Sequence, residues 1–159
     1  MMTGLRTTWR IGIVLLLCAF AAAQDKKESP QPSVGAGNDH FAELRKRAEG
    51  SEGGDRARLF IELAHQEIED ADAKFTAGDA DAAQIEVKQA TADAEQATQT
   101  SINTHKRMKQ TQMAMHELAR RLDGIEHSLT AEDRPQVKSA VDRLQSLATE
   151  LLETMFKRK

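Results

Sequence analysis

Residues 75–90, FTAGDADAAQIEVKQA, decide how this chain folds. Gly78 ends an apolar pattern of helical spacing, and Asp79 can cap the start of a new helix. Beyond the interruption, Ala83 and Val87 begin a second apolar pattern with intervals of four and three residues, as on one helix face. The stretch therefore predicts a tight corner between two antiparallel helices.

The helical periodicity continues in both directions from this corner. It predicts an all-α protein built of elongated antiparallel helical hairpins that pack like a coiled coil. No Gly or Pro follows Gly78 until Gly124, so we expect one long central helix flanked by two shorter helices that lie end to end along it. The expected helices are 39–48, 55–77, 80–128 and 134–157.

Polar residues interrupt the apolar face of the long helix near its middle. Residues 98–104, TQTSINT, combine Thr, Ser and Asn, which are weaker helix formers than Ala, Leu, Glu or Lys. The pattern predicts a continuous helix, and it leaves open whether the helix bends at this point or stays straight.

The first 23 residues have the pattern of a secretory signal peptide. Arg6 and Arg10 lie before and at the start of an apolar run, and three alanines lie directly before Gln24. The run is shorter than the about 20 residues that a membrane span needs. We therefore expect cleavage, export to the periplasm or the exterior, and no membrane span in the mature chain. An uncleaved signal anchor is the alternative.

Residues 24–38, QDKKESPQPSVGAGN, are polar and rich in Pro, Gly and Ser. This composition predicts a disordered linker between the signal peptide and the fold. Residues 39–159 then form a single helical domain, a size that suits one hydrophobic core.

The composition argues against several classes of function. The formal net charge is −3, which disfavours nucleic-acid binding. The only cysteine, Cys18, and the only tryptophan, Trp9, lie in the predicted signal peptide, so the mature chain has no disulfide or thiol chemistry. No catalytic or phosphate-binding constellation is visible. We therefore expect no enzymatic activity and no cofactor.

The corner resembles a single tetratricopeptide-like helical hairpin over about residues 60–90. Gly78 and Asp79 match the turn of that family, and Ala83, Val87 and Ala90 match its small and apolar positions. No proline closes the repeat, and no second copy follows at the family's period of 34 residues. The resemblance implies a helical corner, whereas a peptide-binding groove would need stacked copies.

Two further resemblances give alternative functions. Residues 129–134, LTAEDR, resemble the Leu-Thr-x-x-Gln motif of small periplasmic helical chaperones, with Asp133 in place of the glutamine. This resemblance implies a holdase-like chaperone. Glu62 and His65 form one Glu-x-x-His motif, similar to those of di-iron bundles, which use two such motifs and two more glutamates. It implies a metal-binding bundle, whereas the helical spacing favours a surface pair of His65 with Glu62 or Glu69.

Several apolar residues lie outside the predicted helix contacts and suggest a protein-interaction surface. Apolar area outside the helix contacts usually marks an interface, and a second copy of the chain is the expected cover. The short helix 39–48, which carries Phe41, is the alternative cover for part of this area. The residues are Leu59, Phe60, Leu63, Leu147, Leu152 and Phe156. The sequence thus favours an exported, non-enzymatic structural or protein–protein interaction module of the cell envelope that forms a homo-oligomer.

Overall fold

The structure, a computed structural model, describes residues 34–157, with side chains from residue 39, and this part of the chain forms one compact unit. It is helical with no strand in the described range, which confirms the all-α class. The helices are α1 (Val34–Glu49), α2 (Gly53–Ala77), α3 (Ala80–Thr104), α4 (Met108–Ser128) and α5 (Arg134–Lys157).

The start of α1 differs from the sequence prediction. The linker was expected to reach residue 38, but α1 already begins at Val34. Once Leu44 and Ala48 are packed, adding a further helical turn costs less than starting a helix, so the helix extends over weak helix formers. The predicted signal peptide and residues 24–33 of the predicted linker lie outside the described residues.

The corner between α2 and α3 has the predicted bounds. Gly78 adopts a left-handed conformation with a φ of 83°, and its N–H donates to the carbonyl of Phe75 at 3.0 Å. The N–H of Asp79 donates to the carbonyl of Lys74 at 2.9 Å, and its carboxylate accepts from the N–H of Ala82 at 3.2 Å. These bonds satisfy backbone groups at the end of α2 and the start of α3.

The predicted long helix 80–128 is wrong. α3 ends at Thr104, and α4 begins at Met108. Between them His105 and Arg107 adopt left-handed conformations, with φ angles of 55° and 57°. That conformation costs a non-glycine residue roughly 1–2 kcal/mol, so the local sequence gives little sign of a turn. Packing of α4 and α5 against α2 and α3 offsets this cost.

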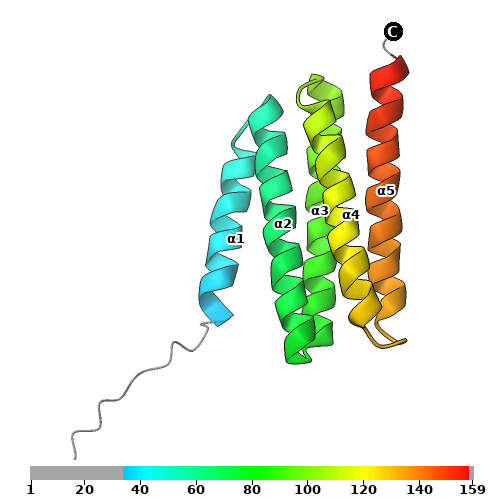
Figure 1. Cartoon of the computed structure of the whole chain (residues 1–159). Helices are drawn as coiled ribbons and strands as arrows, with labels where there is room; N and C mark the ends of the chain where they lie inside the picture. The colour runs from blue at the N-terminus through cyan, green and yellow to red at the C-terminus, as the bar shows by residue number, and fades with distance from the viewer. Residues whose placement is uncertain (1–33, 158–159) are drawn as a thin grey trace, which may run out of the picture. The chain divides into compact units, whose positions relative to one another are not determined.

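The chain reverses direction at this turn. The hydroxyls of Ser101 and Thr111 are hydrogen bonded at 2.7 Å in the buried interior, although a straight helix would hold them roughly 15 Å apart along its axis. Figure 1 shows α2 to α5 running alternately down and up. The α4–α5 pair therefore lies beside the α2–α3 pair, with α5 packed on α3 and α4 on α2, rather than beyond its end.

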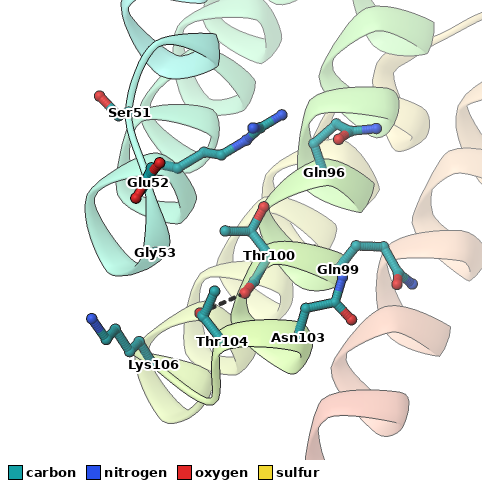
Figure 2. A pocket seen from close by; sticks show the side chains of 10 residues that line it. Ser51, Glu52, Gly53, Gln96, Gln99, Thr100, Asn103, Thr104 and Lys106 are labelled. Carbon is teal, nitrogen blue, oxygen red and sulfur yellow. Dashed lines mark hydrogen bonds between the residues drawn. The ribbon is translucent and has the colours of Figure 1, made fainter.

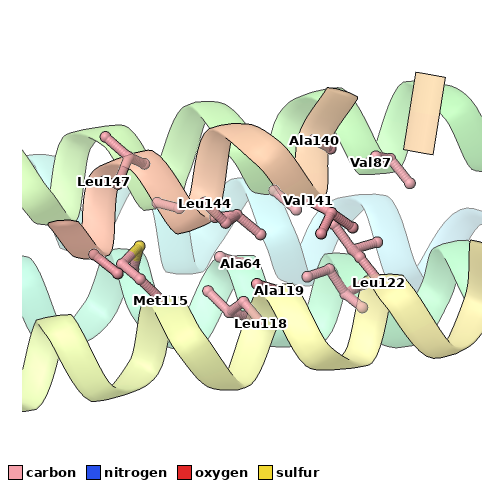
Figure 3. Close-up of a cluster of buried hydrophobic side chains, with 14 of the residues drawn as sticks. Ala64, Val87, Met115, Leu118, Ala119, Leu122, Ala140, Val141, Leu144 and Leu147 are labelled. Atoms are coloured by element: carbon pink, nitrogen blue, oxygen red, sulfur yellow. The ribbon is translucent and has the colours of Figure 1, made fainter. Parts of the chain in front are cut away.

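The main hydrophobic core receives side chains from α2, α3, α4 and α5. Figure 3 shows Leu118 and Leu122 of α4 and Leu144 of α5 within one cluster that also holds Ala64 of α2 and Val87 of α3. α2 and α3 contribute many alanines to the core, and these give room for the larger residues of the second pair. Each fully buried leucine contributes about 1.5–3 kcal/mol of hydrophobic free energy.

Ion pairs on the surface connect the two helix pairs. Arg121 of α4 contacts Glu69 of α2 at 2.8 Å, and Arg143 of α5 contacts Glu95 of α3 at 2.6 Å. Each exposed pair contributes little stability, about 0–1 kcal/mol. Their geometry is specific to the side-by-side arrangement, because each pair joins helices from different hairpins.

Candidate functional site

Four of the six residues predicted to form an interaction surface are buried within the chain. Leu59, Phe60 and Leu63 are at most 3% exposed and form a small cluster with Leu44 and Ala48 of α1. Leu147 is fully buried in the main core. The expectation that these four residues form an uncovered stripe is therefore wrong. α1 covers the three residues of α2, and the unforeseen turn after α3 places Leu147 against the first hairpin.

The other two predicted residues remain at the surface. Leu152 is 41% exposed and Phe156 is 63% exposed, and their spacing of four residues places them on one face of α5. Met113 of α4 is 59% exposed. We call Met113, Leu152 and Phe156 the α4–α5 apolar patch.

A groove between α4 and α5 includes Met113, one residue of this patch, in its lining. Its volume is about 770 Å³, and its lining joins Met113 of α4 to Thr149 of α5. Leu152 follows Thr149 by three residues and lies on the same side of α5. The remaining lining residues are His116, Ala119, Arg120, Asp123 and Gln145. The groove thus has the apolar side chain of Met113 in its lining and carries charges of both signs.

An ion cluster lies beneath α1. The guanidinium Nη2 of Arg45 in α1 contacts Oε1 of Glu67 in α2 at 2.5 Å and Oδ2 of Asp93 in α3 at 2.7 Å. Glu67 is 1% exposed and Asp93 is 3% exposed. Two buried carboxylates therefore share one cation, and that cation comes from α1.

Burial and the neighbouring carboxylate change the protonation of this cluster. Desolvation of Glu67, followed by repulsion from Asp93, raises the pKa of Glu67 from 4.5 to about 8, although Arg45 acts in the opposite direction. The second oxygen of Glu67, Oε2, is buried and has no hydrogen-bond partner in the described part of the chain. Arg45 thus helps to neutralise a site that is costly to leave charged. Sequence reasoning missed this cluster, because its three members belong to three helices.

A polar pocket of about 590 Å³ lies where the α1–α2 turn meets the α3–α4 turn. Figure 2 shows Gln99 and Asn103 of α3 and Lys106 of the following turn around it, and Thr104 donates a hydrogen bond to the carbonyl of Thr100 at 2.6 Å. The remaining lining residues are Ser51, Glu52, Gly53, Arg56 and Gln96. Because cations and a carboxylate share the pocket, its charge does not select ligands of one sign.

The predicted metal motif does not form a ligand cluster. Oε2 of Glu62 accepts from Arg58 at 3.2 Å, one turn earlier on the surface of α2. His65 is half-buried, and desolvation lowers its pKa below 6.5. Among the residues that the structure describes, no group of three or more His, Cys, Asp or Glu side chains could hold a metal ion.

The chaperone-like motif lies in the turn between α4 and α5. The hydroxyl of Thr130 donates to Asp133 at 2.9 Å, and Asp133 also accepts from the amide of Gln84 in α3 at 3.1 Å. These bonds give the motif residues a structural role, since they tie the turn to the first hairpin.

Comparison with known protein families, with curated proteins and with solved structures gave no match to this chain. No helix in residues 34–157 is long and apolar enough to cross a membrane.

Proposed function

We propose that this chain is an exported, non-enzymatic helical protein of the cell envelope that binds another protein through the α4–α5 apolar patch. The observation that carries the proposal is the exposure of Leu152 and Phe156 on one face of α5, beside a groove that reaches Met113 of α4. Large apolar side chains clustered at the surface beside a groove are a common mark of protein-binding sites. The export part of the proposal rests on the signal-peptide pattern of residues 1–23.

The groove suits an amphipathic helix or an extended peptide. The residues of the α4–α5 apolar patch can anchor such a partner, while Arg120 and Asp123 in the groove lining can pair with charges of either sign. A holdase-like chaperone would use a broader apolar surface than the α4–α5 apolar patch, and four of the six residues predicted to form an interaction surface are buried within the chain.

The proposal is tested with the double variant Leu152→Glu and Phe156→Glu in a binding experiment with an extract of the native envelope. We expect the wild-type chain to retain a defined partner. The double variant should bind that partner at least about tenfold more weakly, because two anchor residues are replaced by charges. Circular dichroism should show unchanged helix content, because both residues are exposed.

The matched control is Ile85→Glu. Ile85 is 64% exposed, but it lies on α3 and outside the α4–α5 groove. It should leave partner binding unchanged. If the control and the double variant retain the same proteins equally well, the patch is not the binding surface. If the wild-type chain instead suppresses aggregation of many unrelated unfolded proteins, the chaperone alternative replaces the proposal.

A further inference from the structure

α1 is the least firmly attached helix of the described unit. Its backbone packs against α2 and against no other described helix, and its contact with α3 is made by side chains such as that of Arg45. Figure 1 shows α1 beside α2 at the edge of the bundle. Only three residues, Gly50 to Glu52, join the two helices, and Gly53 directly after them has a left-handed φ of 58°.

α1 covers an apolar surface of α2 and α3, which we call the α1 groove. Leu59, Phe60 and Leu63 of α2 and Ala97 of α3 form this surface, and Leu44 and Ala48 of α1 pack against it. Without α1, three large apolar side chains that are now at most 3% exposed would contact water. Such a surface requires a cover.

The groove also requires a cation from whatever covers it. Glu67 and Asp93 are buried side by side, and Arg45 contacts both. Glu67 holds its proton at a pH below its raised pKa of about 8, but the buried carboxylate of Asp93 beside it is strongly unfavourable without a positive partner. A fitting occupant is therefore a helix with apolar residues at the positions of Leu44 and Ala48 and a guanidinium at the position of Arg45.

We propose that this groove is a helix-docking site through which two copies of the chain associate by exchanging α1. A second copy of the chain fits this description, because its α1 carries the same Arg45, Leu44 and Ala48. In the exchanged dimer, α1 makes the same contacts with the partner's groove that it makes with its own groove in the monomer. The free-energy cost of exchange therefore lies mainly in opening the short α1–α2 turn. This surface is separate from the α4–α5 apolar patch, and the inference does not depend on the function proposed for that patch.

The first experiment shortens the turn by deleting Ser51 and Glu52. The single residue that remains is too short for the usual connection of two to eight residues between antiparallel helices. α1 then cannot reach the groove of its own chain, and we expect a stable dimer in sedimentation at micromolar concentration. The same deletion combined with Leu44→Asp should be a monomer. A deletion chain that stays monomeric with native helix content overturns the proposal.

A second experiment does not depend on whether the deletion variant folds. It uses two full-length variants, Arg45→Glu and Glu67→Lys, each of which places like charges between α1 and its own groove. When the two are mixed, each α1 meets an opposite charge in the groove of the other chain. We expect a mixed dimer that binds at least about 30-fold more tightly than either variant binds itself. A mixture that sediments as the simple sum of the two separate variants contradicts the exchange.

Discussion

At the scale of single residues, Glu67 has the most unusual environment in the described chain. It is 1% exposed, it lies beside Asp93, and its pKa is raised to about 8. No sign of this burial is visible in the sequence, because a glutamate in a helix is usually solvated. Only the approach of α1 and α3 from two sides buries it.

The raised pKa predicts that the chain loses stability as the pH rises. Between 4.5, the ordinary pKa of the carboxyl, and about 8, the folded chain holds one proton more than the unfolded chain. The contribution of Glu67 is therefore complete below pH 4.5 and is lost by about pH 8, on the order of a few kcal/mol. Glu67→Gln should remove this part of the pH dependence, as measured by urea unfolding from pH 5 to pH 9.

The control for this prediction is Glu69→Gln. Glu69 pairs with Arg121 at the surface, where its side chain is 59% exposed. This substitution should leave the slope of stability against pH unchanged. An identical slope in wild type and Glu67→Gln would mean that Glu67 does not carry the effect.

At the scale of the helices, the α2–α3 corner and the α3–α4 turn differ in how clearly the sequence indicates them. Gly78 marks the α2–α3 corner, because glycine adopts a left-handed conformation without steric cost. The α3–α4 turn uses His105 and Arg107 for the same purpose, and neither residue type indicates a left-handed turn as clearly as glycine does. The polar residues of 98–104 were the one local sign of an interruption, and α3 does end at Thr104.

This difference predicts that His105→Gly stabilises the chain. Glycine has no Cβ and therefore avoids the steric cost of a φ of 55°. We expect a gain of about 0.5–1 kcal/mol in the free energy of unfolding, measured by urea denaturation.

The control is the same substitution within a helix, His116→Gly. His116 is an exposed residue of α4, so glycine should cost about 1 kcal/mol there. If both substitutions destabilise the chain equally, the α3–α4 turn is helical in solution, and the original expectation of one long helix regains support.

At the scale of the whole described unit, the side-by-side arrangement joins the two hairpins in one core. Ala64, Val87, Leu118 and Leu144 come from four different helices and belong to one buried cluster. Two hairpins placed end to end along a long helix would bury two separate seams. The arrangement therefore determines whether the hairpins unfold together.

We predict that Leu118→Ala destabilises α2 and α3 as much as α4 and α5. Leu118 is fully buried, so its truncation should cost about 2–5 kcal/mol. In native-state hydrogen exchange, the most protected amides of all four helices should lose protection by the same free energy. Leu152→Ala, at an exposed position, is the control and should have little effect. Retained protection in α2 and α3 would indicate two independently folding hairpins.

The sequence by itself determined the helical class, the α2–α3 corner and the bounds of α5, because apolar spacing, glycine and helix caps act within a few residues of one another. Only the tertiary structure decided the reversal at His105, the cover that α1 places over Phe60, and the meeting of Arg45 with Glu67 and Asp93. These features depend on free energy gained by contacts between distant residues. A left-handed turn without glycine forms when packing of whole helices offsets its local cost, and no local pattern records that balance.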